Sequence, residues 1–397
     1  MTREERRQRQ RWKRHKAREL KEIAKGPIDL PFLVLVLMLT VIGLIMLFSA
    51  SFPSALKEHS DPFYFARSQA IFAAAGIAAM AAMSKFNYQR LRGFSTVALI
   101  GSMVLLALVL TPLGVTRNHA TRWLKMFLVA GPQYQPSELA KLGVIIYFAN
   151  TISLRKDKMR TLWQGFAPYF IILVFYAALL LPEPHLSGCI LIWGIGAVMM
   201  VVGGIHWLWI AAGVGVAGGG LYAMLFTDIM EKIAYNSDRI QTWRDPWWDI
   251  GDKSYQMAQS LISIGSGGLL GVGLGRSRQK FLFLPEEHND YIFAIVCEEL
   301  GMVGAIVIMA LFALLIIRGY WLALHARDRF GTLLVVGITS LLAFQTFFNI
   351  GVVTGFLPPT GISLPFFSYG GTALAIQLAE MGMVLSVSRQ IAAPKAE

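Results

Sequence analysis

Asp290 is the acidic residue whose surroundings most favour proton-transfer chemistry. It follows a long polar segment and directly precedes the apolar run Tyr291–Val296. A carboxylate at such a boundary is partly desolvated, which raises its pKa and makes it a better proton acceptor near neutral pH. Asp is also well suited to cap the N-terminus of a helix. The sequence therefore predicts either a general base or a helix cap at this position.

Glu138 and Lys141 form a second chemical feature, because they lie three residues apart inside the otherwise apolar stretch 136–154. On a helix they share one face and can neutralise each other. Ionisable groups within a membrane span are costly and usually face a polar interior. Structural pairing and a contact between Lys141 and an anionic substrate both fit this pattern.

The composition indicates which elements must position these residues. The chain has 397 residues, of which 55% are apolar and 15% charged, with a mean hydropathy of +0.54. A typical soluble domain is about 25% charged, so an ordinary cytosolic protein is excluded. Since one helical crossing takes roughly 20 apolar residues, the chain can supply about ten crossings. We expect an all-α polytopic membrane protein, either a transporter or a membrane-embedded enzyme.

Uncharged or weakly charged runs predict where the crossings lie. The expected helices are 30–56, 68–84, 93–116, 136–154, 161–181, two within 184–227, then 291–317, 332–355 and 370–387. A large outer loop, residues 228–290, separates the seventh helix from the eighth. About ten crossings, an even number, place both termini on one side of the membrane.

The basic N-terminal segment predicts the orientation. Residues 1–25 hold 11 Lys and Arg against 4 Glu, which is much of the net charge of +12. A basic tail beside a span favours the cytoplasmic side and contact with anionic lipids, rather than nucleic-acid binding. We therefore expect a cytoplasmic tail (1–27), one transmembrane domain (28–390) and a cytoplasmic C-terminal tail (391–397).

The loop after the third expected helix breaks this charge pattern. It contains Arg117, Arg122 and Lys125, yet the helix count places it outside. A cationic outer loop of this kind favours an anionic ligand.

Two polar segments predict loops with specific roles. Six glycines between Gly265 and Gly275 resemble a phosphate-cradling loop, but no lysine follows in a P-loop arrangement, so we expect no nucleotide site. They favour a tight turn beside a packed helix, and backbone amides that meet a lipid pyrophosphate stay a second possibility. The breaker-rich segment 358–371 predicts an irregular outer loop forming one wall of a cavity.

Five stretches together resemble the SEDS family (shape, elongation, division and sporulation), of the FtsW/RodA/SpoVE type. They are TRWLK (121–125), QPSELAKL (135–142), DRIQTWRDPW (238–247), the long stretch from QSLISIGSGG to IVCEELG (259–301) and LPFFSYGGTA (364–373). The last stretch and the long basic tail favour the FtsW or sporulation branch over RodA.

The resemblance implies a ten-helix protein with an outward cavity. It also implies a peptidoglycan glycosyltransferase that polymerises lipid II onto a growing glycan strand. Asp290 falls where the family has its essential loop aspartate, and Glu138 with Lys141 falls on the family's helix-four pair. One stretch departs from the family pattern, because EPHLSG at 183–188 stands where many relatives read nearer QPDLG.

Inverting transfer from a lipid diphosphate needs a base on the acceptor hydroxyl and positive charge at the leaving group. The resemblance assigns the first role to Asp290. Candidates for binding the substrate are Arg122, Glu138, Lys141, Arg244, Arg276 and Arg278. A divalent cation such as Mg²⁺ or Mn²⁺ is an optional helper, for which the sequence shows no dedicated cage.

A class B penicillin-binding protein, a transpeptidase, is the partner that the resemblance implies. The sequence leaves two alternative functions open. A lipid II flippase would use the cationic cavity without needing a base, and a scaffold for the penicillin-binding protein would need neither.

Overall fold

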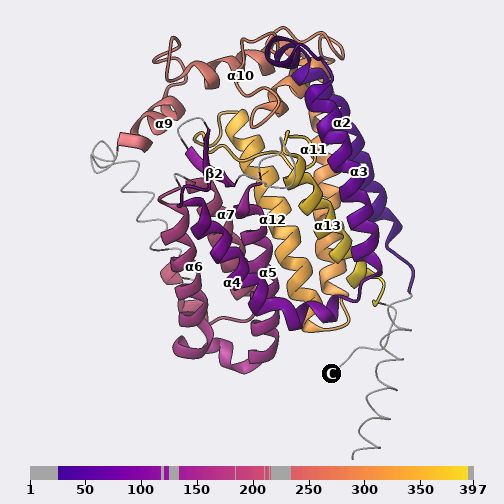
Figure 1. The fold of residues 1–397 in the computed structure, drawn as a ribbon, viewed down its shortest axis with the longest axis vertical. Coiled ribbons are helices and arrows are strands. Elements are labelled where there is room, and N and C mark those ends of the chain that lie inside the picture. The colour runs from indigo at the N-terminus through magenta and orange to yellow at the C-terminus, as the bar shows by residue number, and fades with distance from the viewer. Residues whose placement is uncertain are drawn as a thin grey trace, which may run out of the picture.

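The computed structural model describes residues 26–117, 120–124, 134–183, 185–209, 211–213, 215 and 234–391. This part of the chain is a bundle of long helices (Figure 1). They are α2 (Leu30–His59), α3 (Tyr64–Lys85), α4 (Leu91–Val109), α5 (Pro136–Arg155), α6 (Ala167–Leu180), α7 (Leu186–Val202), α11 (Ile292–Leu324), α12 (Arg329–Val353) and α13 (Gly371–Ser388). The expected all-α polytopic class is confirmed.

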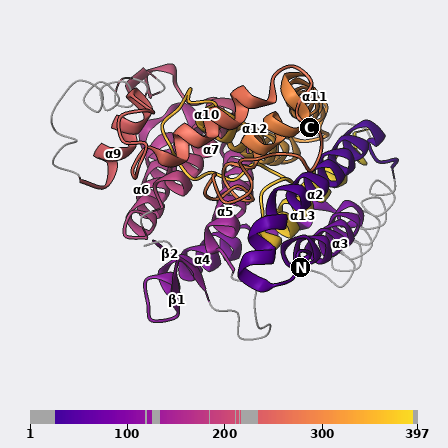
Figure 2. The ribbon, with the colours of Figure 1, turned by 90° about the horizontal axis from the view of Figure 1, so that it is seen from above.

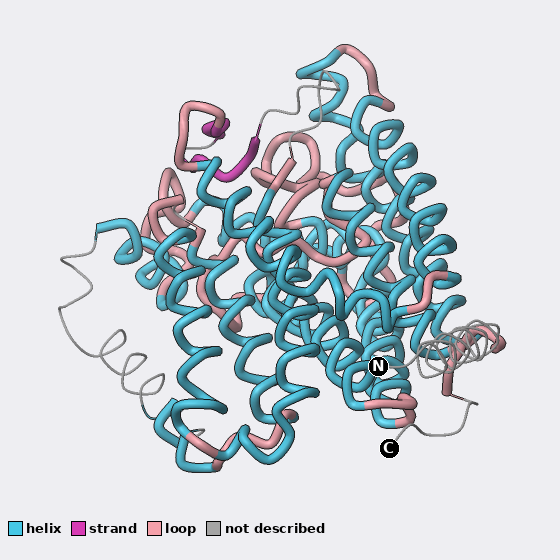
Figure 3. The backbone as a smooth tube through the Cα atoms, turned by 60° about the horizontal axis from the view of Figure 1, so that its bottom comes forward, coloured by secondary structure: helices cyan, strands magenta, loops and turns pink. Residues whose placement is uncertain are grey.

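Shorter elements connect these helices and cover one end of the bundle. Three single turns are η1 (Tyr88–Arg90), η2 (Lys156–Arg160) and η3 (Leu162–Phe166). Helices α9 (Ala234–Arg244) and α10 (Tyr255–Gly267) lie at the same end of the bundle as the hairpin of β1 (Gly114–Arg117) and β2 (Ala120–Leu124) (Figure 1), and Figure 2 shows this end from above. In the described residues β1 and β2 form one two-stranded sheet, and the remaining elements are helices, turns and loops (Figure 3).

Hydropathy explains which helices face lipid and which are central. Within the described residues, seven helical segments are long and apolar enough to cross a membrane, and in most of them less than half of the most apolar window is buried. Helix α12 differs, since 72% of that window is buried. Helix α5 packs against α4, α7 and α12 and buries polar residues such as Lys141. These two helices therefore carry side chains from the centre of the bundle.

The two described ends of the chain meet on one face of the bundle. The amide of Asp29 donates to Ser388 Oγ at 3.2 Å, and Arg389 donates to the carbonyl of Gly26. The Asp29 carboxylate in turn pairs with Arg318 at 2.5 Å. Helices α2 and α13 thus start and end on the same side, as an even number of crossings requires.

Two expected helices need comment. The third was expected to run to Thr116, but α4 ends at Val109 and Gly114 pairs with Leu124 in an antiparallel hairpin. That expectation was wrong, because a run without charges extends past the helix into a strand. The seventh expected helix, in the second part of 184–227, falls largely on residues 216–227, which lie outside the described residues, as do tail residues 1–25 and 392–397.

The glycine-rich segment packs into a break in α11. Gly301 has φ 68° and ψ −172°, which interrupts the helix. The amides of Val272 and Gly273 donate to the carbonyls of Glu298 and Glu299 at 2.9 and 3.0 Å, and the amide of Met302 donates to Gly268. A Cβ on Gly271 would lie 2.2 Å from the Glu299 carbonyl oxygen. Glycine is required here for close backbone approach, and the bonded amides are committed to α11 rather than to a phosphate.

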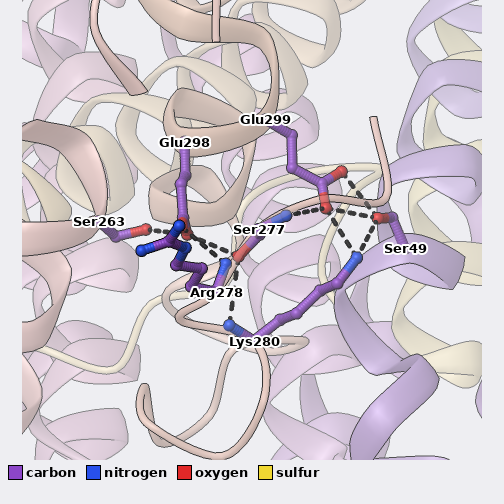
Figure 4. A network of polar contacts seen from close by, with 7 residues as sticks. All are labelled: Ser49, Ser263, Ser277, Arg278, Lys280, Glu298 and Glu299. Carbon is purple, nitrogen blue, oxygen red and sulfur yellow. Dashed lines mark hydrogen bonds and ion pairs between the residues drawn. The ribbon is translucent and has the colours of Figure 1, made fainter. Parts of the chain in front are cut away.

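Two buried glutamates hold the rest of this segment in place (Figure 4). Glu298 accepts hydrogen bonds from Ser263, from Ser277 and from the amide of Arg278 at 2.8 Å. Glu299 pairs with Lys280 at 2.9 Å and accepts from Ser49 of α2 at 2.7 Å. The side chains of Lys280 and Glu299 are 3% and 0% exposed. The pair therefore joins α2, α11 and the segment 228–290.

Replacing Lys280 with Met should destabilise the protein by about 3–5 kcal/mol, because it leaves the buried Glu299 carboxylate without its cation. Thermal unfolding of the purified protein in detergent measures this. The matched control is Lys253→Met, which removes an exposed pair with Asp238 and should cost about 0–1 kcal/mol. Equal losses in the two variants would contradict the role of the buried pair.

Candidate active site

A cavity of about 680 Å³ lies at the end of the bundle that α9 and α10 cover. Its walls come from elements far apart in the sequence. They are the facing ends of α2 and α3, β2, the first turns of α5 and α7, α9, α10, residues 286–291, Gln345 of α12 and the segments 359–363 and 369–373. Both predicted chemical features, Asp290 and the Glu138–Lys141 pair, line this one cavity.

Asp290 is held by its backbone rather than by a helix cap. The N-cap of α11 is Tyr291, and no side chain bonds that cap, so the alternative of Asp290 as helix cap was wrong. Asn349 of α12, which is 2% exposed, donates to the carbonyls of Asp290 at 2.7 Å and Ile362 at 2.8 Å. These bonds fix the backbone and leave the carboxylate directed to the cavity that it lines.

The neighbouring residues are held in the same way. Ser368 donates from its hydroxyl to the carbonyl of Asn289 at 2.7 Å, and the amide of Tyr369 donates to the carbonyl of His288. The buried Glu287 accepts a short bond from Ser54 of α2. Residues 287–290 are therefore joined to α2, α12 and the breaker-rich segment at once.

The pKa of the Asp290 carboxyl is raised to about 6. Burial is the largest cause, and the nearby carboxylate of Glu286 adds to it. The positive charges of Arg122 and Arg239, together with His288, act in the opposite direction. At neutral pH most of the carboxylate is ionised, yet it is more basic than an ordinary aspartate, which suits a general base.

Arg122 and Lys141 supply positive charge to the same cavity. Arg122 lies in β2, and Lys141 lies in the second turn of α5 with 3% of its side chain exposed. Lys141 Nζ pairs with Glu138 Oε2 at 2.7 Å. The sequence prediction of an i,i+3 pair is confirmed, and the pair also faces the cavity.

The other three predicted cations do not line the cavity that the described residues form. Arg244, at the end of α9, is exposed, and so are Arg276 and Arg278 in the glycine-rich segment. Instead Arg239, five residues before Arg244, lines the cavity and donates to the Pro359 carbonyl at 3.2 Å. The sequence prediction named Arg244 and missed Arg239. The pattern DRIQTWR holds both arginines, and residues five apart lie on different faces of a helix, so they do not face the same side.

The breaker-rich segment forms a cavity wall, as predicted. Residues Pro359–Ser363 and Tyr369–Ala373 line the cavity on both sides of the turn at Phe366. Gly361 has φ 71°, and a Cβ there would lie 3.2 Å from Asp290 Oδ2. A side chain at position 361 would therefore crowd the carboxylate as well as strain the backbone.

The described residues contain no group of three His, Cys, Asp or Glu that could hold a metal ion. Asp290 and the nearby Glu286 both line the cavity, and they would hold a divalent cation only together with phosphate oxygens of a bound substrate. We therefore assign no step of the chemistry to a metal.

Comparisons with known proteins decide the family. The family model FTSW_RODA_SPOVE, described as "Cell cycle protein", matches residues 30–393. The chain belongs to this family. A probable peptidoglycan glycosyltransferase FtsW from Geobacter metallireducens is 38% identical over 94% of this chain and 97% of the relative. Stage V sporulation protein E of Bacillus subtilis is 38% identical over 91% and 97%.

Solved structures of FtsW/RodA/SpoVE-type proteins share the fold. A chain from a structure titled "Structural coordination of polymerization and crosslinking by a peptidoglycan synthase complex" has a TM-score of 0.76 and 27% identity, covering 92% of this chain and 99% of that one. The rod shape determining protein RodA of Thermus thermophilus has a TM-score of 0.65 and 28% identity, over 91% and 97%.

Replacing Asn349 with Ala should lower the polymerisation rate at least about 10-fold, because two buried carbonyls lose their donor and Asp290 loses its fixed position. Glycan synthesis from lipid II by the purified variant measures this. Thr354→Ala, which removes a hydroxyl that bonds only within the last turn of α12, is the control and should leave the rate within about twofold. An Asn349→Ala rate equal to that of the control would refute the positioning role.

Proposed function

We propose that this chain is a peptidoglycan glycosyltransferase that polymerises lipid II, with Asp290 as the general base. The observation that carries the proposal is one cavity that holds a half-buried carboxylate of raised pKa together with the cations Arg122 and Lys141. The relatives named peptidoglycan glycosyltransferase match nearly the whole chain and support the activity.

The reaction is one in-line displacement. The 4-hydroxyl oxygen of the acceptor sugar attacks the anomeric carbon of the donor while Asp290 accepts the hydroxyl proton. A new glycosidic C–O bond forms, and the bond from the anomeric carbon to the diphosphate oxygen breaks. The diphosphate leaves with the bonding electron pair, and positive charge from Arg122 and Lys141 stabilises it. Inversion at the anomeric carbon follows from attack on the face opposite the leaving group.

The cavity opens on the outer side of the membrane in this proposal. The opposite end of the bundle, where the described chain ends meet, carries cations between its helices. They are Lys85, Arg90, Arg92, Arg155, Lys156, Lys158, Arg160, Arg318, Arg327 and Arg329. By the positive-inside rule that end is cytoplasmic. Both termini are then cytoplasmic, and the active site faces the compartment where the wall is built.

A class B penicillin-binding protein is the partner that we infer. The structural neighbour with a TM-score of 0.76 comes from a complex whose title pairs polymerisation with crosslinking. A transpeptidase that crosslinks the strands would supply the second of these activities.

Asp290→Asn should lower glycan synthesis by about 10²- to 10⁴-fold, since an amide cannot accept the proton. The measurement is polymer length and amount made by purified protein from lipid II. Asp61→Asn, which removes an exposed pair with Arg67 outside the cavity, is the control and should polymerise normally. An Asp290→Asn protein that polymerises normally would refute the general base. Wild-type protein that moves lipid II across vesicles without making polymer would instead favour the flippase.

The rate should fall as pH drops through about 6, by about tenfold for each further unit, because the protonated Asp290 cannot act as base. Arg239→Gln removes a positive charge that lowers the pKa of Asp290, so this acidic limb should move to higher pH. A pH–rate profile measures both. Arg67→Gln, in an exposed pair, should not move the limb. An unchanged profile in Arg239→Gln would contradict the electrostatic assignment.

A further inference from the structure

Two helices begin at the wall of the cavity opposite the breaker-rich segment. Helix α5 starts at Pro136 and helix α7 at Leu186, and neither N-cap residue, Gln135 or His185, makes a side-chain capping bond. Gln135, Ser137, His185, Ser187 and Gly188 all line the cavity. The first amides of a helix have no partner within it, and they carry a partial positive charge. Pro136 has no amide N–H, and the amide of Glu138 donates to the Gln135 carbonyl at 3.2 Å, so α5 offers the amide of Ser137, while α7 offers its first amides from Leu186 onward. Two such ends therefore face the same space.

Buried side chains between these ends lack hydrogen-bond partners. They are Ser137 Oγ, Ser187 Oγ and His185 Nδ1, in residues that are 2%, 4% and 6% exposed. An unpaired buried polar atom costs free energy comparable to a lost hydrogen bond, so native structures rarely keep one without a reason. Since all three residues line the cavity, a bound ligand would satisfy them.

The charges at this wall select the kind of ligand. Burial, together with the positive charges of Arg122 and Lys141, lowers the pKa of His185 to about 3, so its ring is neutral. Burial raises the pKa of the nearby Glu183 to about 8, so this carboxyl is mostly protonated at neutral pH. Arg122 and Lys141 supply positive charge, and Glu138 balances one of them through its ion pair with Lys141. The wall therefore has excess positive charge.

The hydrogen-bonding groups lead to the same ligand class. Helix amides, arginine and lysine can only donate, and the two serine hydroxyls can rotate to donate. A ligand rich in acceptor oxygens and in negative charge matches this set better than a neutral sugar ring does. Phosphate groups bind at helix N-termini for these reasons.

We propose that the first turns of α5 and α7, with Ser137, His185 and Ser187, bind the diphosphate of the lipid-linked substrate. Each helix end meets one phosphate, and Arg122 and Lys141 lie beside both. This inference rests on the proposed function, because it takes the substrate to be a lipid diphosphate. It adds two helix N-termini and three neutral side chains to a site for which the sequence indicated charged side chains.

The test is binding of inorganic pyrophosphate and orthophosphate to the purified full-length chain, measured by equilibrium binding of the radiolabelled anions. Wild type should bind pyrophosphate at least about 10-fold more tightly than orthophosphate, because two helix ends act on two phosphates. Ser137→Ala/Ser187→Ala should weaken pyrophosphate binding by about 10-fold. Equal affinity for the two anions, or an unchanged affinity in the double variant, would overturn the proposal.

Two controls make the outcome specific. Ser84→Ala/Ser153→Ala removes two buried serine hydroxyls that bond within their own helices, at the ends of α3 and α5 that lie away from the cavity. This variant should bind pyrophosphate as tightly as wild type does. Ser137→Thr/Ser187→Thr keeps both hydroxyls and should restore most of the affinity. If the alanine variant does not fold, thermal unfolding of wild type decides: pyrophosphate should raise Tm more than orthophosphate, and equal shifts would refute the proposal.

Asp290→Asn separates this inference from the proposed function. It should lower polymerisation by about 10²- to 10⁴-fold and bind pyrophosphate at least as tightly as wild type does, because it removes a negative charge that faces the same cavity. Polymerisation by that variant would refute Asp290 as the base and would leave the anion site standing. A wild-type enzyme that polymerises lipid II but binds pyrophosphate and orthophosphate with equal affinity would refute the anion site alone.

Discussion

The break in α11 is the constraint on which the outer half of this structure depends. A helix interrupted inside an apolar bundle exposes amides and carbonyls that need partners, because lipid supplies none. The glycine-rich segment binds those groups between Glu298 and Val303. Once that segment is fixed, the buried pair Lys280–Glu299 ties it to α2, and the chain leading to Asp290 leaves it at a defined place.

The same constraint shapes the electrostatics of the cavity. Asp290 comes from the loop that the broken helix anchors, Arg122 from the hairpin and Arg239 from α9, so three segments distant in sequence set one pKa. Burial raises that pKa, and the two guanidinium groups prevent it from rising further. A base of this strength needs enclosure and cations together, since full enclosure alone would keep the carboxyl protonated at neutral pH.

Much of the fold could be predicted from the sequence, because long apolar runs report directly on helices such as α2 and α11. The end of α4 could not, since the residues after Val109 lack charges and still form a hairpin. The site was predicted where charge stands out against an apolar background, as at Glu138, Lys141 and Asp290. The prediction that Arg276 and Arg278 bind the substrate failed to place them in the cavity. Their position in the glycine-rich motif does not reveal that this segment packs against α11. Choosing Arg239 over Arg244 required knowing the face of α9 that turns inward.

Arg122 links the two halves of the cavity, because its charge lowers the pKa of Asp290 and also that of Glu183 beside the start of α7. An anion bound between α5 and α7 would offset that charge. The carboxylate of Asp290 would then lose part of its stabilisation, and its pKa would rise from about 6 toward neutral pH. A carboxylate with a higher pKa accepts a proton more readily in the transition state. Binding of the diphosphate would in this way strengthen the base at the moment when the acceptor hydroxyl must be deprotonated.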